Sequence, residues 1–306
     1  MIEIINGGML STVQDYGRFG VMKTGFTQSG AMDRHSMQVA NIICGNSPDA
    51  PVVEMTMVGI TAKFTDEHRF CLSGGTFNST LNGRPITNNK CFAAKAGDVL
   101  TVSNCKNGMR IYLAVSGGID VPPVMGSAST NLKLHLGGYE GRALKRGDVL
   151  NTGKASECNS EKEAECETYE KSVEIRVVQG PQYDMFTETD KKLFFSQTYC
   201  VTPYLDRMGI RLNGIALKGK DGLDIISDGI CFGSIQIARS GMPIILMADH
   251  QTAGGYAKIA NVISVDLGRL AQVKQNDMIK FKLVSVKKAE KLALKEKKYI
   301  EKLARS

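Results

Sequence analysis

The sequence has no apolar run long enough to cross a lipid bilayer, so no membrane-spanning helix is expected. Its longest apolar stretch, residues 242–248, is interrupted by Pro243. The N-terminus also lacks a basic segment followed by an apolar one, which is the pattern of a secretory signal. We therefore expect a cytoplasmic protein that does not associate with a membrane.

Motifs of several common sites are absent as well. The eight cysteines form no CxxC pair and the four histidines form no HxxxH or HxH pair, so neither a metal site nor a thioredoxin-like site is expected. No GxxxxGK[ST], GxSxG or GxGxxG segment is present, which excludes a P-loop, a nucleophile elbow and a Rossmann dinucleotide site. Cys71 and Cys231 stand in apolar, strand-like runs, and we expect mostly buried, reduced thiols.

Positive charge is concentrated at the C-terminal end of the chain. Of the formal net charge of +7, residues 287–306 alone account for +5, with eight Lys/Arg against three Asp/Glu. The remaining body, at about +2, has no field of the kind that nucleic-acid binding requires. Ala289, Leu292, Tyr299 and Leu303 recur at helical spacing in this segment. We expect a basic helical tail docked through that stripe, with a membrane-surface or acidic-partner role as the alternative.

Runs with a period of two and short apolar runs, separated by glycine-containing turns, recur along the whole chain. They predict a mainly β protein built as a sandwich or barrel. The clearest strand-like runs are residues 99–102, 110–115, 173–178, 235–237, 243–247 and 278–284. Helices are expected to be few and short, at residues 31–43, 183–186 and 267–272 and in the tail.

One break in composition divides the chain. Residues 151–172 contain six glutamates and no apolar periodicity, which is typical of a polar linker or a hairpin excursion. Similar turns that lead into a strand occur on both sides of the break, with the sequences AGDVL, RGDVL and QNDMI. Their recurrence is explained either by a turn that is common before strands or by duplication of a domain. We expect β-rich domains at residues 1–155 and 173–286, a linker at 156–172 and the tail at 287–306, and we leave open an exchange of segments between the two barrels.

Polar residues gather with glycine in several loops, which is typical of a binding site for a small polar molecule. In such loops glycine lets backbone N–H groups turn toward an anion, and hydroxyl and amide side chains add directional hydrogen bonds. The candidate substrate-binding residues are Ser29, Gly30, Ser127, Ser129, Thr130, Arg207, Gln236, Gln251, Thr252, Gly254, Gly255 and Tyr256.

Three further residues of these loops are candidate catalytic residues for proton transfer, namely Asp249, His250 and Asp33. Asp33 precedes an expected helix, where an acid that complements the helix dipole explains it about equally well. A structural glycine turn is the alternative for the loop of Asp249. Arg207 is either a clamp for a carboxylate or phosphate, or the partner of an acid such as Asp206.

The order of the motifs resembles that of one protein family. The chain carries TVQDYGRFG, GFTQSGAMD, VEMTMVG, YLAVSGGI, GSAST, VVQGPQYDMF, DRMGIRL, ISDGI, FGSIQI and ADHQTAGGYAKIANVI within residues 2–286. It resembles the family of the 5-oxoprolinase C subunit, also known as the KipA or allophanate hydrolase subunit 2 family. It is similar as well to the carboxyltransferase domain of urea carboxylase. The resemblance implies two cyclophilin-like β-barrel domains and leaves the basic tail outside the match.

The resemblance also implies an activity and partners. It implies an ATP-dependent 5-oxoprolinase, an amide (lactam) hydrolase that cleaves 5-oxo-L-proline to L-glutamate in a complex with two partners, its A subunit plus a KipI-like B subunit. Because this chain has no nucleotide motif, ATP is expected in a partner or at a boundary between subunits. One alternative is biotin-dependent carboxyl transfer, with biotin on a separate chain. The other is a non-enzymatic regulator that binds a KipI-like protein and relieves its inhibition of a sensor kinase.

Three positions depart from the usual pattern of that family. Ala128 and His250 stand where relatives usually have arginine, and Leu205 stands where serine is common. Loss of two arginines removes two bidentate anion forks, and His250 restores the charge only when it is protonated. These departures leave the substrate of this chain open.

Overall fold

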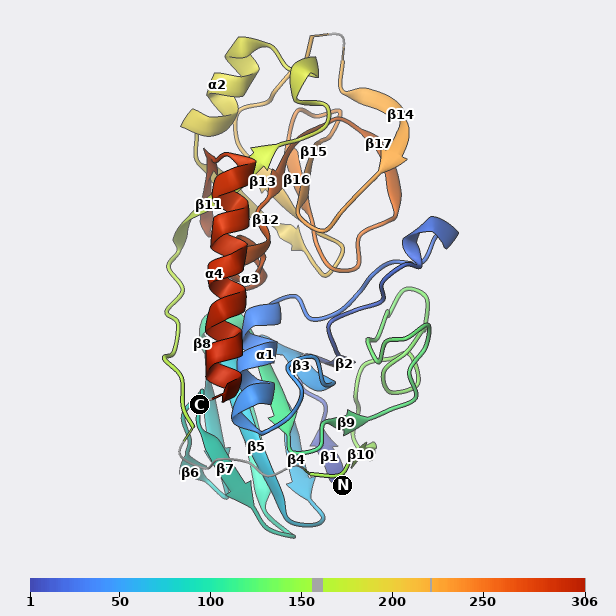
Figure 1. Cartoon of the computed structure of the whole chain (residues 1–306), viewed down its shortest axis with the longest axis vertical. Coiled ribbons are helices and arrows are strands. Elements are labelled where there is room, and N and C mark those ends of the chain that lie inside the picture. Colours follow the sequence, from blue (N-terminus) through green and yellow to red (C-terminus); the bar gives the residue numbers. More distant parts are fainter. Residues whose placement is uncertain (156–161, 221, 306) are drawn as a thin grey trace. The chain divides into compact units, whose positions relative to one another are not determined.

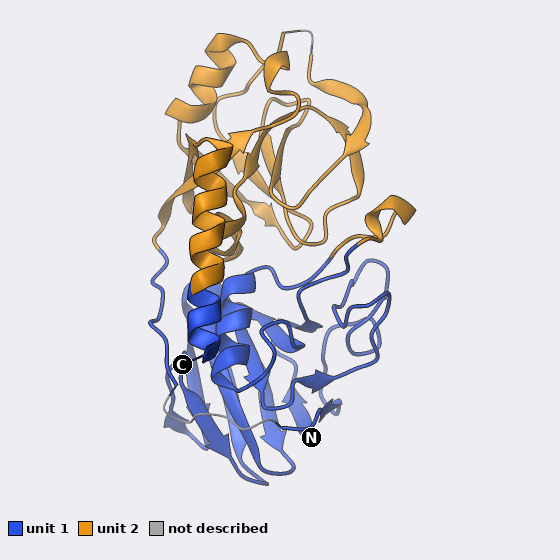
Figure 2. Cartoon of the chain, in the orientation of Figure 1, with its two compact units in different colours: residues 1–19, 29–169, 299–306 blue, residues 20–28, 170–298 orange. Residues whose placement is uncertain are grey.

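In the computed structural model, which describes residues 1–155, 162–220 and 222–305, the chain divides into two units (Figure 2). Unit 1 contains Met1–Phe19, Ser29–Tyr169 and Tyr299–Ser306. Unit 2 contains Gly20–Gln28 and Glu170–Lys298. Each unit therefore takes segments from more than one part of the sequence.

Unit 1 is built on a ten-stranded sheet (Figure 1). Its strands are β1 (Ile2–Asn6), β2 (Leu10–Gln14), β3 (Val52–Thr56), β4 (Thr61–Phe64), β5 (His68–Leu81), β6 (Arg84–Pro85), β7 (Cys91–Ala94), β8 (Val99–Val115), β9 (Ile119–Asp120) and β10 (Val149–Thr152). Their order is β2-β3-β8-β4-β1-β10-β9, and β5 pairs with β6, β7 and β8. The long antiparallel pair of β5 and β8 forms the centre of this sheet.

Both faces of the sheet are buried at β8, which explains the continuous apolar run at its end. Successive side chains of a strand point to opposite faces. Ile111 and Leu113 belong to the main core cluster of unit 1, whereas Tyr112 and Ala114 belong to a second cluster with helix α1 (Arg34–Ile43). The helix buries its apolar stripe on β5 and β8 (Figure 1).

Unit 2 is a closed barrel with the strand order β11-β18-β15-β16-β13-β12-β19. The barrel strands are β11 (Ser172–Gln179), β12 (Tyr199–Leu205), β13 (Gly209–Asn213), β15 (Ser234–Ile237), β16 (Pro243–Leu246), β18 (Lys258–Val262) and β19 (Met278–Leu283). The barrel closes through a parallel pairing of β11 with β19. A separate two-stranded sheet joins β14 (Asp224–Gly229) to β17 (Ala253–Tyr256).

Helices are short except at the C-terminus. Besides α1, the structure has α2 (Glu188–Ser196), α3 (Leu267–Ala271) and α4 (Val286–Arg305), together with 3-10 turns at Met22–Thr24, Tyr183–Met185 and Ser264–Asp266. Helix α2 was missed by the sequence analysis because its apolar stripe is weak. Its signal is the capping box of Thr187 and Asp190, and it packs on the barrel through Phe194, whose ring stacks on Phe281 at 4.7 Å between centroids.

The mainly β fold with two barrel-like sheets and a helical tail is confirmed. The three similar turns are also confirmed, and in each the aspartate accepts a hydrogen bond from the backbone N–H three residues earlier. These bonds run from Lys95 to Asp98, from Lys145 to Asp148 and from Lys274 to Asp277. Each aspartate thereby fixes the turn immediately before β8, β10 or β19.

One expectation is corrected by the structure. Of the described cysteines, only Cys44 and Cys71 are buried, and Cys231 is exposed because residues 230–233 form a turn rather than a strand. Residues 156–161 of the predicted linker lie outside the described residues. The segment after them is held on unit 1, since the Asn89 and Asn107 side chains donate to the carbonyl oxygens of Glu165 and Tyr169, both at 2.7 Å.

The docked face of helix α4 generates a stability prediction. Ile300, which was absent from the predicted stripe, is 8% exposed and joins the cluster under helix α1, and Tyr299 stacks on His35. Ile300→Ala is expected to lower the free energy of unfolding by about 2 kcal/mol or more, the usual range for truncating a buried isoleucine. Thermal and urea unfolding measure this change.

Leu294→Ala is the matched control, because Leu294 lies in the same helix and is 60% exposed. Its expected change is within about 0.5 kcal/mol, as for other surface substitutions. Equal losses in the two variants would show that helix α4 does not dock through Ile300.

Candidate functional site

Two candidate residues of unit 1, Ser127 and Ser129, lie beside Asp15. Its carboxylate accepts hydrogen bonds from the hydroxyls of Ser127 and Ser129, at 2.6 and 2.5 Å, and from the backbone N–H of Ala128 at 2.6 Å. It also accepts from the N–H of Gly17. The carboxylate therefore fixes both its own turn and the loop of the GSAST motif.

Other groups of unit 1 hold the same loop. The hydroxyl of Thr130 donates to the carbonyl of Val13 at 2.9 Å, and the buried guanidinium of Arg18 donates to the carbonyls of Val124 and Ser129. Gly138, with φ +55°, lies so close to Thr130 that a Cβ atom would collide with the threonine hydroxyl. The predicted binding hydroxyls of Ser127, Ser129 and Thr130 thus donate within the protein.

Asp33 is the N-cap of helix α1. Its carboxylate accepts from the backbone N–H and the hydroxyl of Ser36, at 3.0 and 2.7 Å, and its own N–H donates to the hydroxyl of Tyr112. Burial raises the pKa of Tyr112, so that its hydroxyl keeps its proton and donates to Glu54 at 2.8 Å. The geometry of Asp33 is that of the helix-capping alternative.

Ser29 and Gly30 are buried next to this helix. Ser29 takes the left-handed conformation, with φ 55°, and its hydroxyl oxygen accepts from the side chain of Asn131 at 3.2 Å. Gly30 has φ 96°. The two residues lie in the loop that precedes the cap at Asp33.

In unit 2, Arg207 and Asp249 form a buried ion pair. The guanidinium Nε and Nη2 atoms lie 2.8 and 3.2 Å from the two carboxylate oxygens, and the N–H of Asp249 donates to the Arg207 carbonyl at 2.7 Å. Asp206 instead accepts from the N–H groups of Met208 and Gly209. The fork of Arg207 is therefore occupied by Asp249 and fixes the loop in which His250 lies.

His250 is fully buried and has one ring nitrogen without a partner among the described residues. Its Nδ1 lies 2.7 Å from the carbonyl oxygen of Gln251 and must be the protonated nitrogen, because a carbonyl only accepts. The Nε2 atom then carries a lone pair and has no hydrogen-bond partner in the described part of the chain. Burial lowers the pKa of His250 from its ordinary value of 6.5, so the imidazole is neutral near pH 7 and does not replace an arginine charge.

The remaining candidates of unit 2 lie on or beside β17. Gln236 is buried and its Nε2 lies 3.4 Å from the Tyr256 carbonyl. Gly254 and Gly255 are strand residues of β17, and Gln251 is exposed. Thr252 differs from these residues because it lines a cavity of about 410 Å³.

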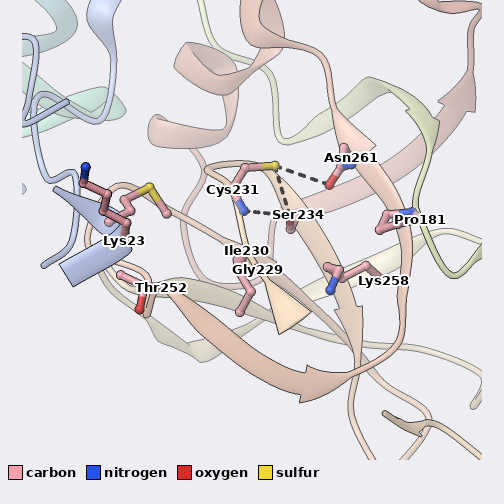
Figure 3. A pocket seen from close by; sticks show the side chains of 10 residues that line it. Lys23, Pro181, Gly229, Ile230, Cys231, Ser234, Thr252, Lys258 and Asn261 are labelled. Carbon is pink, nitrogen blue, oxygen red and sulfur yellow. Dashed lines mark hydrogen bonds between the residues drawn. The ribbon is translucent and has the colours of Figure 1, made fainter. Parts of the chain in front are cut away.

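This cavity lies within unit 2 and is surrounded by segments of several of the sequence motifs (Figure 3). Its lining residues are Met22, Lys23, Pro181, Gly229, Ile230, Cys231, Ser234, Thr252, Lys258 and Asn261. Lys258 is 2% exposed, and its Nζ lies 2.8 Å from the carboxylate of Asp228. The sequence analysis missed Lys258. Its signal was one lysine at the start of strand β18, whose other residues are apolar apart from Asn261.

Two kinds of site find no support in the described residues. Across residues 1–155, 162–220 and 222–305, no cluster of three or more His, Cys, Asp or Glu side chains could hold a metal ion. In the same part of the chain, no helix is both long enough and apolar enough to cross a membrane.

Comparison with known proteins shows the family to which the chain belongs. The family model described as the carboxyltransferase domain, subdomain A and B, matches residues 24–283, and the chain belongs to this family. It is 38% identical to the C subunit of 5-oxoprolinase from Haemophilus influenzae, over 100% of this chain and 98% of that protein. The same protein of Escherichia coli is 38% identical over 99% of this chain and 98% of its own length. Both alignments extend well into the basic tail, whereas the match to the family model ends before it, at residue 283.

The structure is also similar to a larger enzyme. The urea carboxylase of Kluyveromyces lactis superimposes with a TM-score of 0.93 at 31% identity, over 99% of this chain but only 29% of that protein. The urea amidolyase of Lachancea kluyveri is 34% identical over 98% of this chain and 18% of its own length. The chain therefore corresponds to one part of these longer proteins.

The buried His250 generates a prediction on pH and stability. Because its pKa is lowered in the folded chain, the unfolded chain binds a proton more readily just below pH 6.5. The stability that the neutral His250 contributes is fully present when the pH is above the pKa of His250 in the unfolded chain. It is lost as the pH falls through the lower pKa of His250 in the folded chain. Wild type should therefore lose more stability than His250→Asn between about pH 7.5 and 5.5.

Urea unfolding at several pH values measures this difference. Asparagine retains an N–H that can donate to the Gln251 carbonyl, but it does not titrate. Other titrating groups are the same in both proteins and cancel in the comparison. A stability difference that does not change with pH would contradict a neutral, buried His250.

Proposed function

We propose that this chain is the C subunit of an ATP-dependent 5-oxoprolinase, which cleaves 5-oxo-L-proline to L-glutamate together with the A and B subunits. The observation that carries the proposal is the 38% identity over nearly the whole length of both chains. A lactam is a poor electrophile, and phosphorylation of its oxygen by ATP makes it a good one. The sequence has no phosphate-binding loop, so we assign ATP to a partner or to a boundary between subunits.

Within this proposal, His250 is the proton acceptor and the Arg207–Asp249 pair positions it. A general base needs a lone pair that no protein donor occupies. The Nε2 atom of His250 meets this condition and has no partner in the described part of the chain, whereas the Asp249 carboxylate is held in a two-point ion pair by Arg207. Because Nε2 is buried, the loop of His250 must move to admit the substrate or a water molecule.

The assembled enzyme provides the first test. Co-expression with the A and B subunits is expected to give one complex on size-exclusion chromatography. That complex should release labelled glutamate from labelled 5-oxo-L-proline only when ATP is present. Complex formation without any glutamate would remove the enzymatic proposal and favour a regulator that binds a KipI-like partner.

The second test concerns His250. In the assembled enzyme, His250→Asn is expected to lower kcat about 100-fold, the usual contribution of a general base, while KM changes little. His135→Asn is the matched control, because His135 is exposed in unit 1 and its backbone φ of 51° is one that asparagine accepts. An unchanged kcat in His250→Asn would assign the histidine to loop structure alone.

Biotin-dependent carboxyl transfer to an amide-like acceptor is the second candidate. It is favoured by the family model and by the superposition on urea carboxylase at a TM-score of 0.93. This function requires a biotin carboxylase and a biotinylated carrier on other chains. A streptavidin blot of the native complex, together with the biotin dependence of its activity, separates the two candidates.

A further inference from the structure

The cavity of unit 2 has a positive lining. Of the described residues that line it, two are lysines and none is an aspartate or glutamate. Its volume of about 410 Å³ lies in the range of small-molecule sites. Met22, Pro181 and Ile230 give it apolar walls, and Ser234, Thr252 and Asn261 add polar groups. This combination favours a small anion with an apolar body.

Lys258 is the group on which this preference depends. An ammonium group has three N–H donors, and burying it is unfavourable unless they are paired. Within the described residues, the acceptor that Nζ reaches is Asp228, at 2.8 Å. At least one donor of a side chain that is 2% exposed is thus left for a ligand. Figure 3 shows the Lys258 side chain among the lining residues.

Asp228 holds the Lys258 ammonium group in place. Its carboxylate accepts from Lys258, from the Gln182 side chain at 3.2 Å and from the N–H of Gly229 at 2.8 Å. The hydrogen bond from Lys258 is the largest of the contacts that lower the pKa of Asp228, so the acid stays ionised. Asp228 is 52% exposed, and solvent therefore weakens its hold on the ammonium.

We infer that the cavity of unit 2 binds a small carboxylic acid, with the Nζ of Lys258 as the counter-ion of its carboxylate. The choice of acid rests on the proposed function and is 5-oxo-L-proline. The carboxylate takes a free donor of Lys258, and the lactam ring lies against the apolar wall. Thr252 and Asn261 offer a hydroxyl and an amide to the polar edge of the ring.

Cys231 provides a readout that requires no catalytic activity. It lines the cavity and is exposed, with its Sγ 3.2 Å from the Ser234 hydroxyl. In the purified full-length chain, 5-oxo-L-proline is expected to slow the alkylation of Cys231 by iodoacetamide several-fold, as followed by peptide mass spectrometry. Cys166 is exposed in unit 1 and serves as the internal control whose alkylation does not change.

Two further probes define the chemistry. The lactam 2-pyrrolidinone has the same ring without the carboxylate and should protect Cys231 much less. Inorganic phosphate should also protect it less, because it has no apolar body. Equal protection by 2-pyrrolidinone would overturn the role of the carboxylate, and equal protection by phosphate would overturn the selectivity for a carboxylic acid.

Lys258→Met is expected to weaken binding of 5-oxo-L-proline about 10- to 100-fold, the range for one hydrogen bond to a charged group. Lys282→Met is the matched control, since Lys282 is 58% exposed in the same barrel and pairs with Glu174. Equal affinity of wild type and Lys258→Met would overturn the inference. If Lys258→Met does not fold, protection of Cys231 in the wild type decides alone.

The outcomes separate this inference from the proposed function. Protection of Cys231 without glutamate formation by the complex would retain the binding site and remove the 5-oxoprolinase. Glutamate formation without protection of Cys231 at millimolar 5-oxo-L-proline would retain the enzyme and overturn the site.

Discussion

The parallel pairing of β11 with β19 is the interaction on which unit 2 depends. It runs over six residue pairs, from Ser172–Met278 to Val177–Leu283, and joins the first strand of the barrel to the last. Without it both strands would be edges with unpaired backbone groups. The closed order places β18 between β11 and β15, where Lys258 lies opposite Gln236 and Asn261 opposite Ser234. The cavity is thus assembled by strand register rather than by one local motif.

The two units use their polar groups in different ways. In unit 1, Asp15 and Asp33 accept backbone N–H groups and hydroxyls, so that loops rich in serine and glycine are satisfied internally. In unit 2, a histidine nitrogen has no protein partner in the described part of the chain, and a buried lysine has one acidic partner. The cavity and the buried lysine that lines it, rather than the number of polar residues, favour the second unit as the place for a ligand.

Local patterns predicted the elements of this protein better than its site. Period-two runs identified β11 and β19, and a short apolar run identified β16, because both patterns require only neighbouring residues. The exposure of Cys231 depends on the turn before β15, and the burial of Ile300 depends on contacts with residues far along the chain, which no local pattern reports. Lys258 was missed for the same reason, because its partner Asp228 lies 30 residues away. The loops of unit 1 were predicted to bind a small polar molecule. The sequence did not reveal that their hydroxyl and N–H groups already donate to the carboxylate of Asp15.

The division of the chain has a consequence for its synthesis on the ribosome. The cluster under helix α1 includes Ile300, so residues near both ends of the chain contribute to one core. The segment between Tyr169 and Tyr299 is translated before that core is complete. At about 5–20 residues per second, this takes on the order of 10 s. During that interval the nascent chain presents an apolar face beside helix α1 that the last turns of helix α4 later cover.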